Sequence, residues 1–141
     1  LDGQIRATSA FKKAALMVLG LAVQRYGDDL NDEQEVLSWA ADILIDTFAA
    51  ESCVLRALQA VAEAPSNVDL QIDAACVFVN DAASRIETST RSALAAIAEG
   101  HSLHIYLSTL QKFLRETPIN TVPMRRRLAD AVVSRAGYIF G

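Results

Sequence analysis

Proline and glycine occur at few positions in this sequence, and their placement limits the fold more than any other feature. Pro65 separates two segments, 31–64 and 66–99, that contain neither residue. Both segments lack the period-2 alternation of a strand and carry apolar residues at helical spacing. Because a 30-residue helix is about 45 Å long, two such helices joined by a short turn must pack antiparallel.

Glycine and proline also mark the ends of the other predicted helices. The predicted helices are 5–26, 31–64, 66–99, 102–115 and a last one that Thr121 and Pro123 open. Gly27 follows the first helix as a C′ residue, and Asn31 with Gln34 forms a capping box for the second. Gly100 closes the third helix. The sequence therefore predicts an all-α fold for residues 1–141, an up-down four-helix bundle with two very long central helices and a last helix broken near Pro118.

The composition indicates one compact domain and excludes some partners. The 141 residues are 52% hydrophobic and 21% charged, which favours a single core over disorder. A net charge of −4 leaves no dominant basic surface, so nucleic acid is not an expected partner. The longest apolar run, 14–23, is about half of the roughly 20 residues that a membrane span needs. We interpret it as a buried core helix, with surface membrane contact as the alternative.

Cysteine usage and the first residues bear on the compartment. Cys53 and Cys76 lie 23 residues apart, which is neither a disulfide framework nor a metal-binding spacing. A reducing compartment, the cytoplasm, fits this usage best. The start of the chain shows no signal-peptide pattern. It begins with Leu1 rather than Met, which indicates a processed chain or a piece excised from a larger protein.

The second predicted helix carries three carboxylates whose directions can be assigned at about 100° per residue. With Leu44 as the centre, the expected inner face holds Leu37, Ala40, Phe48, Leu55, Leu58 and Ala62, widened on one side by Val36, Ile43, Val54 and Val61. Asp42 and Asp46 then face away from the core, on a solvated surface. Glu51 points inward and needs a bonding partner, because an unpaired buried charge costs several kcal/mol. We expect that partner to be Arg85, or else Asn80.

The outer face of the same helix is not uniformly polar. Trp39, Ala49, Cys53 and Ala60 fall there among the charged residues. Such residues are consistent with a face that something covers, but scattered exposed apolar residues are also normal in monomers. Both interpretations stay open at this stage.

Few residues could carry chemistry. His101 and His104 form an H-x-x-H pattern, but the sequence holds no further His to complete a metal site, and the E-x-x-H pairs of di-iron bundles are absent. The cysteines have no histidine in a plausible order for nucleophilic catalysis, and no glycine-rich phosphate loop occurs. The basic cluster 125–127 opposes the helix dipole, so an acidic partner is expected in another helix, a partner domain or an anionic lipid surface. The sequence thus predicts no catalytic, cofactor-binding or metal-binding residue.

Three stretches nevertheless carry a resemblance to a known family. They are AADILIDTFAAESCVLRA (40–57), ASRIE (83–87) and RRRLADAVVSRAGYIF (125–140). Together with the order of the helices, they resemble the C-terminal helical domain of acyl-CoA dehydrogenases of the very-long-chain type and its bacterial relatives. The resemblance covers nearly the whole chain and includes no catalytic motif.

The resemblance implies that this chain is the C-terminal part of a longer flavoenzyme. The full enzymes of that family use FAD to oxidise acyl-CoA thioesters to enoyl-CoA in fatty acid β-oxidation, with a catalytic glutamate that takes the α-proton. The flavin and acyl-CoA sites lie in preceding domains, so no catalytic or FAD residue transfers to this chain. The implied role is non-catalytic: packing on, and stabilising, the catalytic core or its dimer.

The family also implies partners and a location. Its C-terminal domain packs on the catalytic domains, in a homo-oligomer. A eukaryotic member would lie in the mitochondrial matrix or on the inner-membrane face, and mitochondrial members are linked to membrane association. The long linking segment tied to that association is not identifiable in this sequence.

Two other functions remain as alternatives. The first is a free-standing helical interaction or oligomerisation module that assembles through the same outer face. The second is a metalloenzyme that uses the carboxylates or the histidines. Metal content of the purified protein tests the second, and the reading frame upstream of Leu1 tests the first.

Overall fold

The computed structural model describes residues 1–63, 66–115 and 117–140. Within these residues all regular structure is helical. The helices are α1 (Asp2–Tyr26), the 3₁₀ helix η1 (Gly27–Asp32), α2 (Gln34–Glu63), α3 (Val68–Ile97), α4 (Gly100–Phe113) and α5 (Val122–Arg135). The all-α prediction is therefore confirmed. The predicted helix end at Ala64 and Pro65 lies outside the described residues.

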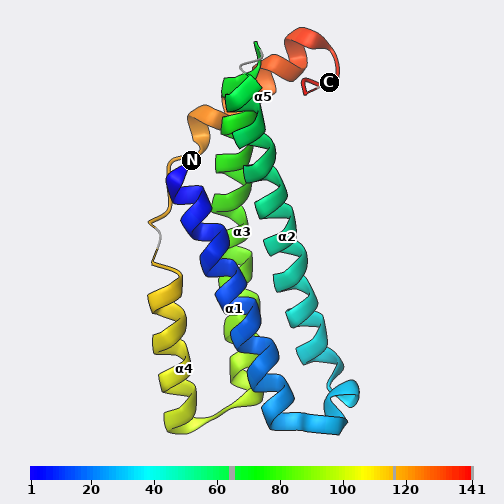
Figure 1. Cartoon of the computed structure of the whole chain (residues 1–141), viewed down its shortest axis with the longest axis vertical. Coiled ribbons are helices and arrows are strands. Elements are labelled where there is room, and N and C mark those ends of the chain that lie inside the picture. The colour runs from blue at the N-terminus through cyan, green and yellow to red at the C-terminus, as the bar shows by residue number, and fades with distance from the viewer. Residues whose placement is uncertain (64–65, 116, 141) are drawn as a thin grey trace.

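The helices run up and down along one long axis (Figure 1). α1, α2 and α3 pack against one another and form the body, and the most extensive contact joins the two 30-residue helices α2 and α3. The shorter α4 lies along α1 and α3 on the side away from α2 (Figure 1). α5 sits at the end of the bundle, where it packs against α3 alone among the described helices.

The helix ends confirm one sequence prediction and correct two. Gly27 ends α1 at φ +54° and donates its backbone N–H to the Val23 carbonyl, a conformation that suits glycine. The capping box is wrong: residues 27–32 form η1, α2 begins at Gln34, and the Gln34 side chain donates to the Asn31 carbonyl. Gly100 does not close α3, which ends at Ile97. It begins α4, at φ +58°.

The core is built largely from small side chains. Phe11, Val18, Ile43, Ile86 and Leu94 are its largest fully buried apolar residues along α1, α2 and α3. Between them lies an alanine seam, which we define as Ala40, Ala50, Ala57 and Ala60 of α2 with Ala75, Ala82 and Ala93 of α3, all buried. Side chains that end at Cβ allow helix backbones to approach closely, because the side chains at the contact set the interaxial distance.

The apolar run 14–23 is buried on one side only. Ala14, Ala15, Val18 and Ala22 are buried in the core, as predicted, whereas Leu16 and Val23 are exposed. Among the described residues, no helix combines the length and the apolar character that crossing a membrane requires.

The predicted inner face of α2 is wrong by about 80°, counted at about 100° per residue. The buried residues of α2 centre near Val36, Ile43 and Val54, which were expected only to widen the face. Leu44, the expected centre, is exposed, and Phe48 is 74% exposed. The physical reason is that α2 is apolar over two adjacent arcs, and only one of them meets α1 and α3.

The predicted inner face of α5 is only partly correct. Met124 and Leu128 are half-buried, but Val132 is exposed. No residue of α5 is fully buried. The helix is thus attached at its N-terminal half and has no core of its own.

The Thr90 hydroxyl is buried without a hydrogen-bond partner in the described structure. We expect Thr90→Val to raise the free energy of unfolding by about 1 kcal/mol, because the replacement has nearly the same shape and removes the cost of a buried unsatisfied group. Urea unfolding followed by circular dichroism measures the change.

Thr47 provides the matched control. Its buried hydroxyl donates to the Ile43 carbonyl at 2.6 Å, so Thr47→Val removes a made hydrogen bond and should be neutral or destabilising. If both variants shift stability in the same direction by the same amount, the hydroxyl of Thr90 does not carry the cost assigned to it.

Candidate functional site

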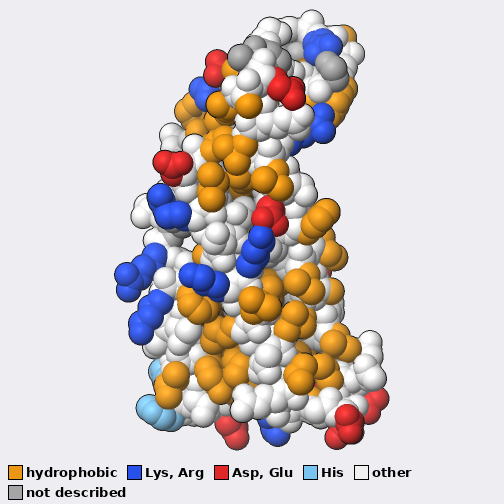
Figure 2. Space-filling view, viewed as in Figure 1, with side chains coloured by type: hydrophobic (Ala, Val, Ile, Leu, Met, Phe, Trp, Pro, Cys, Tyr) orange, Lys and Arg blue, Asp and Glu red, His pale blue; other side chains and the backbone are white. Residues whose placement is uncertain are grey.

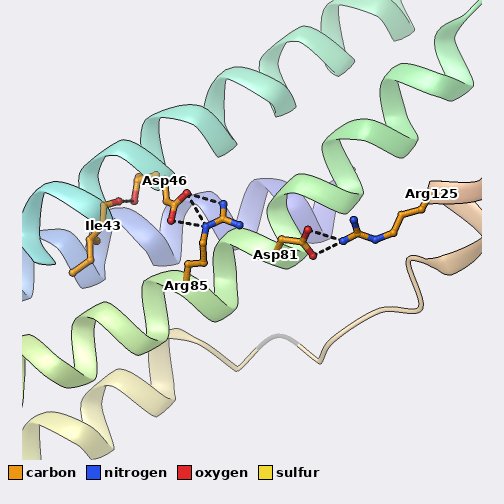
Figure 3. Close-up of polar contacts among 6 residues, drawn as sticks. Ile43, Asp46, Asp81, Arg85 and Arg125 are labelled. Carbon is orange, nitrogen blue, oxygen red and sulfur yellow. Dashed lines mark hydrogen bonds and ion pairs between the residues drawn. The ribbon is translucent and has the colours of Figure 1, made fainter. Parts of the chain in front are cut away.

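The carboxylates of α2 form ion pairs to neighbouring helices rather than a site. Glu51 pairs with Lys12 of α1, so the predicted bond to Arg85 or Asn80 is wrong. Arg85 of α3 instead makes a bidentate pair with Asp46, at 2.7 to 3.2 Å (Figure 3). These hydrogen bonds raise the pKa of Arg85 above its ordinary value. Both carboxylates thus lie where α2 packs against a neighbouring helix, and an ion pair neutralises each of them.

The rotation of α2 explains both corrections. Turning the helix by about 80° moves Glu51 from the centre of the core to the boundary with α1. The same turn brings Asp46, expected to be solvated, to the boundary with α3, where its side chain is 17% exposed. Asp42 stays exposed, as predicted.

The basic cluster 125–127 of α5 pairs with acidic residues of α3. Another helix of the same chain was one of the three sources expected for its acidic partners. Arg125 donates from Nη2 to both carboxylate oxygens of Asp81, at 2.6 and 2.7 Å (Figure 3). Arg127 makes a bidentate pair with Asp73, from Nε and Nη2, at 2.7 Å to each carboxylate oxygen. The hydrogen bonds that Arg127 donates to Asp73 raise the pKa of Arg127. We call these two ion pairs, Arg125–Asp81 and Arg127–Asp73, the clamp between α5 and α3. Its four residues have a structural role.

The histidines and cysteines are not assembled into a metal site. His101 and His104 are exposed in the first turns of α4. Across the described ranges, no group of three or more His, Cys, Asp or Glu side chains is placed to hold a metal ion. Cys53 is half-buried and Cys76 is buried, and both thiols are free.

Both thiols are expected to react slowly with iodoacetamide at pH 8. Burial raises the pKa of Cys53 and of Cys76, so a smaller fraction of each is thiolate than in a free thiol at that pH. Labelling should accelerate as the pH rises beyond 9, and Cys53 should react before Cys76 because it is less buried. Peptide mass spectrometry against time measures both rates, and rapid labelling of native Cys76 at pH 8 would contradict the buried position.

One cavity of about 160 Å³ lies between α1, α3 and the segment after α4. Its walls include Phe11, Val79, Leu114 and Ile119, with Cys76 and Glu87 as the titratable groups. Burial raises the pKa of Cys76, and among the described residues the cavity lining holds no histidine and no carboxylate besides Glu87. The described lining therefore shows no acid–base pair and no activated nucleophile.

Part of the outer face singled out from the sequence is covered from within the chain. Trp39 packs against the core, and Ala60 is buried. Ala49 and Cys53 are half-buried. Of the two interpretations left open, a covered face therefore holds in part, and the cover comes from this chain itself.

Comparison with known proteins identifies a family, which the side chains described above do not. Residues 10–112, most of the chain, match the family model described as "Acyl-CoA dehydrogenase, C-terminal domain". The chain belongs to the acyl-CoA dehydrogenase C-terminal domain family. This confirms, at the level of the family, the resemblance that the sequence carries.

Two relatives place this C-terminal domain in longer proteins. The domain is 37% identical over 128 residues to a probable acyl-CoA dehydrogenase of Bacillus subtilis (strain 168), which covers 90% of this chain and 22% of the relative. It also superimposes on the crystal structure of an acyl-CoA dehydrogenase complexed with FAD from Bacillus anthracis. That match has a TM-score of 0.93 and 35% identity, and it covers 96% of this chain and 23% of the other. The chain thus spans less than a quarter of the length of either relative.

Proposed function

We propose that this chain is the non-catalytic helical domain of an FAD-dependent acyl-CoA dehydrogenase of fatty acid β-oxidation, and that it packs on and stabilises the flavin-bearing catalytic part. The observation that carries the proposal is the family membership, together with a match to under a quarter of an FAD-complexed acyl-CoA dehydrogenase. The described residues add support, since eight of their titratable side chains form four ion pairs between helices. In this proposal residues 1–141 form one domain, and FAD, acyl-CoA and the catalytic glutamate belong to the rest of the polypeptide.

The full-length protein from the same gene tests the proposal. We expect it to purify with bound FAD, visible as flavin absorbance, and to be bleached by an acyl-CoA thioester under anaerobic conditions. The 141-residue chain alone should show neither signal. A full-length product with no flavin would overturn the proposal.

A truncated full-length protein tests the stabilising role. Deleting residues 1–141 of this chain should lower the melting temperature of the flavin-bearing part, or change its oligomeric state, because a packing surface is then left in water. Unchanged melting and unchanged mass in light scattering would count against a stabilising role while leaving the enzyme assignment in place.

We further propose a homo-oligomeric enzyme in a reducing compartment, the cytoplasm of a bacterium. Two free thiols and 35–37% identity to Bacillus proteins support this location. The alternative of a free-standing module would gain support if the gene encoded little beyond these residues.

A further inference from the structure

The exposed arc of α2, together with α1, forms an apolar surface that the chain does not cover. We call it the α1/α2 apolar face and define it by Ile5, Leu16 and Val23 of α1 and Leu44, Phe48 and Leu55 of α2, all exposed. Nine of the fifteen large apolar side chains exposed in the described part of the chain lie on these two helices. Figure 2 shows hydrophobic side chains gathered over the α1–α2 part of this view, with an acidic and a basic side chain in contact near its middle and further charges at its left edge, top and lower tip.

The residues of the face are continuous across the two helices. At about 100° per residue, Leu44, Phe48 and Leu55 fall within about 40° of one another on α2. The Lys12–Glu51 ion pair fixes how the antiparallel helices are aligned. It places Leu16 level with about residue 47 and Ile5 level with about residue 58. Two apolar stripes therefore lie side by side.

The apolar arc of α2 is wide, and only about half of it is buried against α1 and α3. A surface helix normally has one apolar stripe toward the core and a polar opposite face. α2 has a buried stripe of Val36, Ile43 and Val54, and beside it the exposed stripe of Leu44, Phe48 and Leu55. A helix that is apolar over so wide an arc is typical of a position between two packing partners.

The charges of the face indicate what kind of partner fits it. Lys12 and Glu51 lie within it and neutralise each other, so the face presents no unsatisfied charge to a second surface. Permanent interfaces resemble a domain core cut in half, whereas transient ones are more polar. The face thus fits an apolar surface that stays in place.

We infer that the α1/α2 apolar face is the surface that docks on the flavin-bearing part of the same polypeptide. This inference rests on the proposed function. The two relatives carry the matched domain within chains more than four times as long. A tethered surface acts at an effective concentration in the millimolar range, so it outcompetes a second copy of this domain for an apolar face.

Side-chain footprinting of the full-length protein tests the inference without a mutation. Hydroxyl-radical oxidation of each aromatic residue is compared between the native and the urea-unfolded protein. Phe11, 1% exposed, sets the buried reference, and Tyr138, 70% exposed on the far end of the molecule, sets the open one. We expect Phe48 to behave as Phe11 does, with oxidation reduced by about fivefold or more in the native protein.

Each outcome decides a different statement. If Phe48 is oxidised as readily in the native as in the unfolded protein, the inference is wrong. If Phe48 is open but other exposed residues of this chain are protected, the domain docks through another face and the proposed function stands. Protection of Phe48 that disappears on dilution to the monomer assigns the face to a second copy and overturns the inference. Absence of flavin overturns the proposed function whatever Phe48 does.

A pair of variants gives an independent measure. Phe48→Glu in the full-length protein should lower the melting temperature, while Val133→Glu, at a position 79% exposed on α5, should leave it unchanged. In the 141-residue chain alone, neither variant should change it, because both positions already face water there. Equal melting of the full-length Phe48→Glu and Val133→Glu proteins would contradict the inference.

Discussion

Replacing Phe11 with alanine is expected to lower the free energy of unfolding of the 141-residue chain by about 3–5 kcal/mol. Phe11 is the largest fully buried side chain of the core and lies on α1, which packs against both long helices. The residues of α3 that line the cavity beside it, Cys76, Val79 and Ala83, are small and cannot expand to fill the space. Since a domain of this size is stable by about 5–15 kcal/mol in total, the variant should unfold at much lower urea concentration.

Phe48→Ala is the matched control for this prediction. It removes the same atoms from a side chain that is 74% exposed, so the isolated chain should change by no more than about 0.5 kcal/mol. Urea titration followed by circular dichroism at 222 nm gives both values, with unchanged slopes as the check on two-state unfolding. A Phe48→Ala loss as large as that of Phe11→Ala would mean that α2 is rotated as its sequence pattern suggested.

The second large effect is expected at the clamp between α5 and α3. Arg127→Gln should reduce hydrogen-exchange protection of the α5 amides by about tenfold or more, with α1 to α3 unchanged. α5 buries none of its residues fully and packs against α3 alone among the described helices. Met124 and Leu128 are half-buried, and the two ion pairs add to that contact. Without Arg127, the carboxylate of Asp73, only 5% exposed, is left without its bidentate partner.

Two variants separate this mechanism from a loss of charge. Arg126→Gln removes the same charge from the same helix at a side chain for which the described structure shows no ion pair, and it should leave protection intact. Adding Asp73→Asn to Arg127→Gln should restore part of the protection, because the buried charge that needed a partner is then gone. Equal losses in Arg126→Gln and Arg127→Gln would rule out the clamp.

Residues near the C-terminus add a weaker tether to the same region. Ile139 is buried, and its carbonyl accepts hydrogen bonds from Asn67 at 2.9 Å and from Arg135 at 3.3 Å. This contact holds the end of the chain near the start of α3. We therefore expect the α5 variant to loosen locally rather than to release the whole segment after residue 121.

The sequence was sufficient to predict which segments are helical, and some of their ends are encoded locally. Gly27 supplies the positive φ that ends α1, and Pro123 stands in the first turn of α5. Two other ends were misplaced, because α2 begins without the predicted capping box and Gly100 begins α4 instead of closing α3. The antiparallel order followed from helix length and short connections. The basic cluster of α5 was rightly expected to need acidic partners, since its charge opposes the helix dipole.

The sequence could not give the rotation of α2, and the cause is physical. Periodicity locates the middle of an apolar arc, and on α2 that arc includes both the buried stripe near Ile43 and the exposed stripe near Phe48. The pattern places its midpoint at Leu44, but Leu44 belongs to the exposed stripe. The prediction of Glu51 as a buried acid and Asp46 as a solvated one followed from that midpoint. The partner of Glu51 was missed because Lys12 comes from α1, whose own rotation was not assigned.

That this chain holds no catalytic, cofactor-binding or metal-binding residue stays a prediction, and no single chemical motif identifies the family. Packing helices are recognised by the order and pattern of many ordinary residues, and no single side chain identifies them. The matched region 10–112 begins within α1, ends one residue before the end of α4 and leaves out α5, where the clamp lies. The attachment of α5 is therefore a feature of this chain that the family match does not describe.

The alanine seam limits how this domain can diverge. A residue that ends at Cβ has no rotamer to change, so an added methyl group between α2 and α3 must push one long helix away from the other. Over 30 residues, such a shift would move the whole outer surface of α2 and misplace any protein docked on it. Among orthologues we expect glycine, alanine or serine at these seven positions, while the apolar face changes in step with the surface opposite it. A sequence alignment would thus show little variation at the alanine-seam positions of α2. The exposed apolar positions of α2 would co-vary with residues far away in the polypeptide.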